Sequence, residues 1–167
     1  MTVRPFVAGP DRRLRTPAAP VEAVDDGVRA IWQDMIDTMV AMPGVGLAAP
    51  QIGVMLRLAV VDETGTGHAA FRLANPEIVA SAAELSRHEE ASPNLPGVSA
   101  MLERPEWVEV VYLDESGTRR RRRFSGLAST SVQHQIDHLD GRMYFDRLGR
   151  VKRQMLIERA RKLARRG

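Results

Sequence analysis

Residues 133–141 read Gln-His-Gln-Ile-Asp-His-Leu-Asp-Gly, and this stretch decides how the rest of the chain is interpreted. It closes the segment 126–139, whose apolar residues recur at three- and four-residue intervals before Gly141. That spacing predicts a helix with one buried face. His134 and His138 are four residues apart, so both imidazoles lie on the same side of the predicted helix.

Two histidines at this spacing can bind one metal ion. In zinc hydrolases with the pattern His-Glu-x-x-His, the glutamate after the first histidine takes a proton from a metal-bound water. Here that residue is Gln135. Its neutral amide can orient a water through hydrogen bonds but cannot remove the proton. By spacing alone, the alternative interpretation is a helix with two hydrogen-bonded histidines and no metal.

A second stretch, Gly44 to Gln51, reads Gly-Val-Gly-Leu-Ala-Ala-Pro-Gln and resembles the first motif of the peptide deformylases. Residues 133–141 are similar to that family's third motif except at Gln135. The resemblance covers about residues 1 to 150. Because two specific motifs occur in the right order, we identify the chain as a member of this family and treat its activity as a separate question.

The family's second motif, Glu-Gly-Cys-Leu-Ser followed by Pro-Gly, is similar to residues 90–97. Ser92 occupies the position of the cysteine, and Pro93 follows it. The resemblance implies hydrolytic removal of the formyl group from N-formylmethionyl nascent peptides. It further implies a divalent ion, Fe²⁺ or Zn²⁺, at the positions of Ser92, His134 and His138. The catalytic positions it implies are Gln135, in place of the activating glutamate, and Gln51, which would bind the substrate carbonyl together with a backbone N–H at position 93.

Three of these positions depart from the family pattern. The hydroxyl of Ser92 stays neutral near pH 7 and binds Fe²⁺ or Zn²⁺ weakly. Gln135 removes general acid–base catalysis, which contributes about 10²–10⁴ in rate. Pro93 has no backbone N–H, and the loss of one such donor costs about 10²–10³ in rate. We therefore expect a weak or absent metal site and impaired deformylase activity. The alternative is an active hydrolase with a non-standard metal or an altered substrate.

The pocket can keep a binding role without the reaction. The resemblance implies substrate contacts at Gly44, Val45, Gly46 and Leu47, and the ligand would be a peptide N-terminus or a related small molecule. The alternative for these residues is a tight glycine-rich turn that leads into a buried strand. For Ser92 the alternative to metal binding is a loop hydroxyl that bonds nearby backbone.

The remaining sequence predicts one α+β domain, residues 1–167. With 167 residues, 44% of them hydrophobic, the chain can bury a single core. It contains no cysteine, which excludes disulfides and thiolate ligands. No apolar run is long enough to cross a membrane, and we expect a cytoplasmic protein. Besides the helix at 126–139, the patterns predict a helix from Asp25 to the stop at Pro43-Gly44, strands at 56–61, 71–73 and 77–80, and a hairpin of 107–113 with 118–124.

Positive charge gathers in two places. Arg119 to Arg123 fall on the second arm of the predicted hairpin, where a solvated edge strand is the simplest interpretation. Residues 151–167 predict a basic amphipathic helix with a single acid, Glu158. Bacterial deformylases resemble this in ending with a helix that can contact the ribosome, which implies ribosomal RNA as a partner. The alternative is a helix that packs on its own domain.

Overall fold

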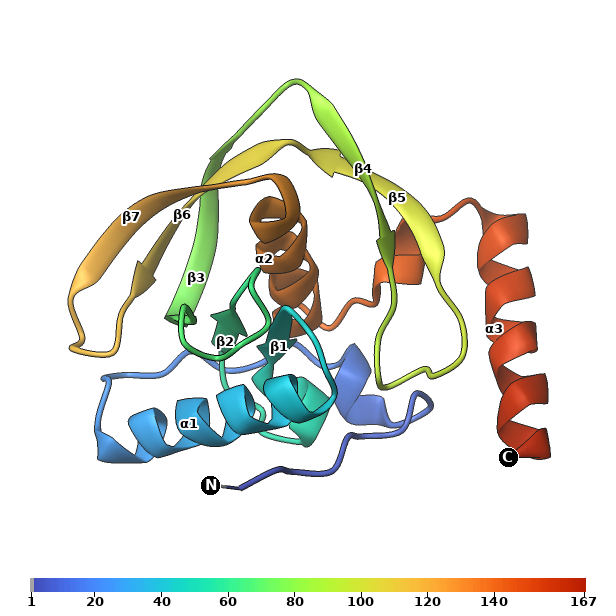
Figure 1. The fold of residues 1–167 in the computed structure, drawn as a ribbon, viewed down its shortest axis with the longest axis horizontal. Helices are drawn as coiled ribbons and strands as arrows, with labels where there is room; N and C mark the ends of the chain where they lie inside the picture. The colour runs from blue at the N-terminus through green and yellow to red at the C-terminus, as the bar shows by residue number, and fades with distance from the viewer. Residues whose placement is uncertain (1) are drawn as a thin grey trace.

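A computed structural model describes residues 2–167. It confirms a single α+β domain with a C-terminal helix (Figure 1). The helices are α1 (Asp26–Ala41), α2 (Gly126–Leu139) and α3 (Arg150–Arg166), with short 3-10 helices η1 (Arg12–Arg15), η2 (Ala49–Ile52) and η3 (Tyr144–Arg147). The strands are β1 (Gly46–Ala48), β2 (Leu58–Val61), β3 (Phe71–Ser81), β4 (Leu85–Glu90), β5 (Ala100–Pro105), β6 (Trp107–Leu113) and β7 (Arg119–Ser125).

Two antiparallel sheets surround α2. The first has the order β1-β2-β3-β6-β7, and the second is the hairpin β4-β5. The two sheets are joined by short connections, from β3 to β4 and from β5 to β6. Backbone hydrogen bonds from Ala82 to Trp107 and from Glu106 to Glu84 hold these two connections together. The second sheet therefore arches over α2 (Figure 1), and Ser92 and Pro93 of the loop that follows β4 line the same cavity as His134.

α1 forms as the spacing predicts. The side chain of Asp25 accepts a hydrogen bond from the backbone N–H of Val28 at 2.9 Å, which caps the helix start. Trp32, Met35 and Met39 are fully buried and belong to the same core cluster as β1 and β2. This packing fixes β1, and with it one wall of the candidate site.

α2 is buried nearly all around, which is unusual for a helix with so many polar residues. Its polar side chains bond backbone groups of neighbouring segments instead of water. Ser129 and Gln133 both donate to the carbonyl of Pro105, at 3.0 and 3.1 Å. Ser131 donates to the carbonyl of Val45 at 3.0 Å. The helix is thereby held in a defined orientation against both sheets.

The structure differs from the sequence predictions in three places. The strands expected at 71–73 and 77–80 are one strand, β3, because Asn75 takes φ 50° at an irregularity in the register and the strand continues past it. The hairpin β4-β5 was not predicted, since its residues are mostly charged or polar. No helix was predicted before Asp25, but the structure contains η1 there, whose start is capped by the side chain of Asp11.

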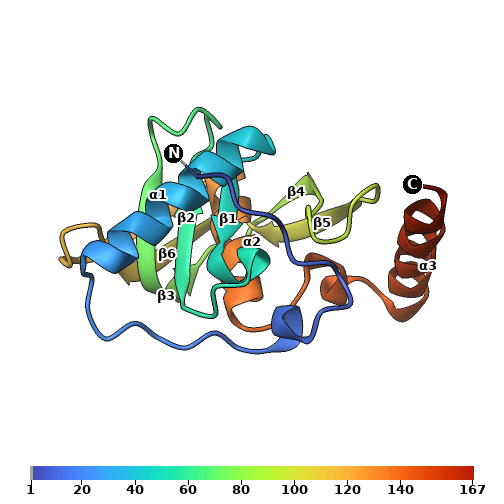
Figure 2. The same cartoon turned by 90° about the horizontal axis from the view of Figure 1, so that it is seen from below.

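The basic C-terminal helix is present as α3 and stands at one end of the molecule, far from α1 (Figure 2). Only Leu156 and Ala160 of this helix are buried, against a cluster that includes Tyr144 and Phe145. The interface with the rest of the domain is therefore small. Within residues 2–167, no helix is both long and apolar enough to span a bilayer.

Candidate active site

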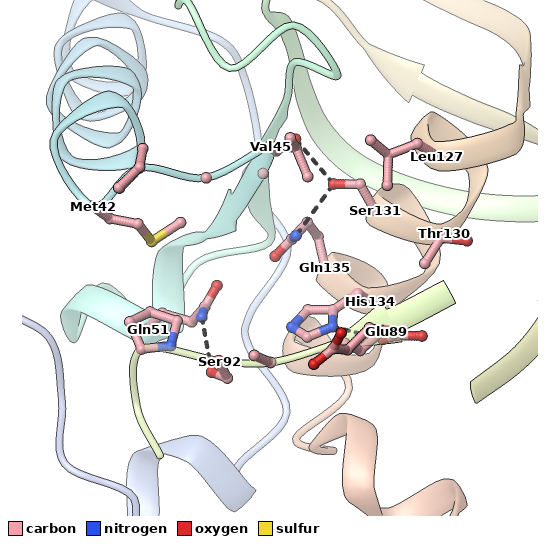
Figure 3. Close-up of a pocket in the computed structure, with 16 residues that line it drawn as sticks. Met42, Val45, Gln51, Glu89, Ser92, Leu127, Thr130, Ser131, His134 and Gln135 are labelled. Atoms are coloured by element: carbon pink, nitrogen blue, oxygen red, sulfur yellow. Dashed lines mark hydrogen bonds and ion pairs between the residues drawn. The ribbon is translucent and has the colours of Figure 1, made fainter. Parts of the chain in front are cut away.

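A cavity of about 390 Å³ lies where β1, the loop after β4 and α2 meet. Figure 3 shows Gln51, Ser92, His134 and Gln135 around it. The cavity is also lined by Gly44, Val45, Gly46 and Pro93. Most of the site residues predicted from the sequence therefore lie around one cavity. Leu47 differs: its side chain is fully buried in the core beside α1. At the neighbouring position 46, a residue larger than glycine would not fit, because a Cβ there would clash with Ser131 and lie 2.6 Å from the amide nitrogen of Gln135.

The two histidines face each other through their Nε2 atoms, which are 3.2 Å apart. His134 Nδ1 lies 2.8 Å from a carboxylate oxygen of Glu90, so this nitrogen carries the proton. The two Nε2 atoms share one hydrogen bond, in which either ring can be the donor. Burial, with the neighbouring His134, holds the pKa of His138 well below its ordinary value, so this imidazole is neutral.

Behind His134 lies a network of ion pairs, here called the Arg104 network, which joins the buried Glu90, Arg104 and Asp137 to the exposed Arg147. Arg104 is 1% exposed and binds Glu90 with two hydrogen bonds of 2.6 and 2.9 Å. It also reaches Asp137 at 3.0 Å, and Arg147 binds the same carboxylate at 2.7 and 2.8 Å. Arg104 is therefore the cation that the two buried carboxylates share.

The Arg104 network keeps both carboxylates ionised. Burial by itself would raise the pKa of Glu90, but hydrogen bonds from His134 and Arg104 hold it below the ordinary value. Burial likewise opposes ionisation of Asp137, whose pKa is held low by its bonds to Arg147 and the charge of Arg104. Each negative charge is therefore already matched, and neither carboxylate is free to act on a ligand.

The other side of the cavity is uncharged. Ser92 donates its hydroxyl proton to Asn94 Oδ1 at 3.1 Å, and Gln51 Nε2 donates to the same oxygen at 2.8 Å. The amide of Asn94 donates in turn to the backbone carbonyls of Val7, at 2.7 Å, and Gln51, at 3.0 Å. Sequence reasoning missed Asn94, because its partners at Val7 and Gln51 lie far from it along the chain.

Gln135 occupies the base position and is 5% exposed. Its Nε2 lies 3.5 Å from the hydroxyl of Ser131, which itself donates to Val45. Its carbonyl oxygen is buried and has no hydrogen-bond partner among residues 2–167. The side chain of Gln135 thus offers one unused acceptor beside the cavity (Figure 3).

The donor set does not fit a resident hydrolytic metal ion. The two imidazoles converge, but the third ligand position offers only the neutral hydroxyl of Ser92. That hydroxyl donates its hydrogen bond to Asn94. His138 Nδ1 has no outer partner within the described chain, unlike most metal-binding histidines. Nowhere in residues 2–167 do three His, Cys, Asp or Glu side chains gather closely enough to hold an ion.

His88 does not complete the set. Its Nδ1 lies 2.9 Å from the hydroxyl of Thr130, and the residue is not part of the cavity wall. His88, Glu89 and Glu90 therefore do not form a metal-binding set in the structure.

The family model for polypeptide deformylases matches residues 3–154. The chain belongs to the peptide deformylase family. A "peptide deformylase-like" protein of Bradyrhizobium diazoefficiens is 42% identical over 165 residues, covering 99% of this chain and 96% of the relative. A peptide deformylase of Methylocella silvestris is 43% identical over 169 residues, covering 98% and 86%. Relatives of both names occur at the same level of identity, so overall similarity does not decide activity.

Solved structures agree with the deformylase fold. The crystal structure of a peptide deformylase from Legionella pneumophila superposes with a TM-score of 0.91 at 40% identity, covering 98% of this chain and 96% of that one. The peptide deformylase from Ehrlichia chaffeensis, in complex with actinonin, gives a TM-score of 0.89 at 34% identity, covering 97% and 98%. Deformylases are metal-dependent enzymes, which makes the donor set of this chain the decisive question.

Proposed function

We propose that this protein uses the deformylase pocket to bind the formylated end of a peptide and hydrolyses it poorly or not at all. The observation that carries the proposal is Gln135. This amide stands where the reaction needs a base, its nitrogen faces Ser131, and no free carboxylate is within the buried part of the cavity to replace it. Glu89 also lines the cavity, but it is exposed and accepts a hydrogen bond from Ser99.

The uncharged wall favours an acylated amine over a free one. An N-terminal ammonium would enter a site whose only buried carboxylate, Glu90, is already bound to Arg104 and His134. Burying a cation without a counterion is costly. A formamide is neutral, so it enters the same wall without that cost. The proposal therefore includes a preference for the formylated over the deformylated peptide.

The rest of the cavity suits an apolar first side chain. Met42, Pro43, Val45 and Leu127 line it, and its exposed surface is mostly apolar. A methionine side chain would be removed from water there, which contributes about 1.5–3 kcal/mol for full burial. Gly44 and Gly46 leave the backbone of this wall open to close approach.

A binding and turnover experiment on the purified chain tests the proposal. Calorimetry with a formyl-Met tripeptide should show saturable binding at least about tenfold tighter than with the same peptide bearing a free amine. Formate release, measured in parallel with added Fe²⁺ or Zn²⁺, should stay far below that of a competent deformylase. Tight retention of one Fe, Zn or Ni per chain together with rapid formate release would instead establish the alternative, an active hydrolase with a non-standard metal site.

A second proposed role concerns α3 and the ribosome. The helix buries only Leu156 and Ala160, and its basic residues are exposed beside the single acid Glu158. Such a surface favours contact with ribosomal RNA through the release of counterions. Salt-sensitive co-sedimentation with ribosomes should disappear when residues 151–167 are removed. Binding that persists without the tail would refute this role.

A further inference from the structure

A second cavity, here called the α3 cavity, lies between the β4-β5 hairpin and α3 and has a volume of about 510 Å³. β5 and α3 are neighbours at the same end of the molecule in both views (Figures 1 and 2). Its wall shares no residue with the pocket beside His134. Arg87 comes from β4, Met101 from β5, and Lys152, Met155 and Arg159 from α3. The inference drawn from it does not depend on the function proposed for the other pocket.

The charge of the α3 cavity is unbalanced. Arg87, Lys152 and Arg159 line it, no carboxylate does, and none of the three cations forms an ion pair within residues 2–167. Glu103 lies opposite Arg87 in the β4-β5 register, yet the two make no such pair. Three cations around one hollow favour an anion.

Some arginines of β7, by contrast, do have carboxylate partners. Arg120 pairs with Asp114, and Arg121 and Arg123 both pair with Glu109. Three of the five arginines on that strand are thus neutralised by the domain itself, whereas Arg119 and Arg122 form no ion pair within residues 2–167. In the α3 cavity the domain supplies no such partner, which leaves the charge available to a ligand.

The apolar part of the α3 cavity is also uncovered. Lys152, Met155 and Arg159 are spaced by three and four residues, so they share one face of α3. Met155 is 64% exposed and Met101 is 46% exposed. Methionine thioethers adapt to flat surfaces and make favourable contacts with aromatic rings. A ligand with a charged end and a flat apolar body would use both features.

We propose that the α3 cavity binds a phosphate-bearing ligand with an aromatic body, the chemistry of a nucleotide. A phosphate monoester carries about −1.5 to −2 charges and three acceptor oxygens, which matches three cations better than the single charge of a carboxylate. The two guanidiniums can each bind such a group with paired N–H donors. The aromatic base would cover Met101 and Met155. The volume falls in the usual range for small-molecule sites, about 300–1,000 Å³.

Calorimetric titration of the full chain tests this site with three probes: adenosine 5′-monophosphate, adenosine, and a short single-stranded RNA. The nucleotide should bind at one site and adenosine should not. Arg87→Gln and Arg159→Gln should each weaken binding about tenfold, because each removes a hydrogen bond to a charged group. The matched control is Arg166→Gln, which alters the same helix outside the cavity and should change the affinity less than about twofold.

The outcomes separate the sources of the phosphate. Saturable binding of the mononucleotide indicates a free nucleotide, whereas binding of RNA alone that Arg87→Gln weakens indicates a strand. Met155→Glu, at a position 64% exposed, should keep the fold and abolish either kind of binding. The proposal is overturned if neither the mononucleotide nor the RNA binds saturably. It is also overturned if Arg166→Gln weakens binding as much as Arg87→Gln does, since that result would mean diffuse attraction to the basic helix.

Discussion

The two sides of His134 differ in how their polar groups are satisfied. Behind it, the Arg104 network matches buried charges one against another. In front of it, Ser92, Asn94 and Gln51 are all neutral and bond among themselves. A buried charge destabilises the fold when its partner is removed, whereas neutral groups can close their own hydrogen bonds. The comparison indicates that this fold needs the charges behind the histidines and does not need a reactive group in front of them.

The largest effect should come from restoring reactive groups to the neutral side. The double variant Ser92→Cys, Gln135→Glu, loaded with Fe²⁺ or Zn²⁺, should raise formate release from a formyl-Met peptide by at least about 10²–10⁴. Pro93 still lacks a backbone donor, so the rate should remain about 10²–10³ below that of a complete site. Each single variant serves as a control. A double variant that holds metal but gains no activity would show that the neutral side differs from a complete deformylase site in more than these two side chains.

The next effect is the loss of the central cation. Arg104→Met leaves Glu90 and Asp137 buried with fewer partners, and should reduce the free energy of unfolding by about 3–5 kcal/mol in urea denaturation. Arg121→Met is the matched control, because its pair with Glu109 is at the surface, where Arg121 is 63% exposed. The control should lose about 0–1 kcal/mol. Similar losses in both variants would contradict a structural role for the Arg104 network.

A smaller effect is expected on the neutral side. Asn94→Ala removes the shared partner of Ser92 and Gln51 and leaves the carbonyl of Val7 without its donor, and it should cost about 1–3 kcal/mol of unfolding free energy. Gln154→Ala provides the control, since that amide bonds Glu158 on the exposed face of α3. If Asn94→Ala is as harmless as the control, the neutral groups are not a unit.

The smallest effect depends on pH. Bonding to Arg120 lowers the pKa of Asp114 from 3.8 to about 2, so the carboxylate stabilises the fold above its ordinary pKa. That contribution should disappear as the pH falls from about 4 to 2, and it should not exceed about 1 kcal/mol because Arg120 is exposed. Thermal unfolding of Asp114→Asn should therefore differ from wild type at pH 6 and approach it near pH 2. A constant difference would exclude this carboxylate as the source.

Sequence patterns predicted the elements that rest on apolar periodicity. α1 and α2 were located within a residue or two, and the β6-β7 hairpin was found from its turn. The β4-β5 hairpin was missed because its inner face carries His88, Glu90 and Arg104, whose pairing with other segments replaces the apolar signal.

The site residues, likewise, were only partly predictable from the sequence. Its residues could be located wherever they fall in a motif, as for Gln51, Ser92 and Gln135. Asn94 and Arg147 could not, because their roles depend on partners brought close only by the fold. A hydrogen bond between distant segments leaves no periodic trace in a sequence.

The bond from Asn94 to the carbonyl of Val7 has a consequence for motion. Val7 also donates its N–H to Gln51 at 2.9 Å, so both backbone groups of this arm residue are held by the pocket wall. Segments outside helices and strands often open independently of the core, and their amides then exchange with solvent quickly. Here the amide proton of Val7 should exchange only when the pocket itself opens, which makes this amide a reporter of whatever occupies the cavity.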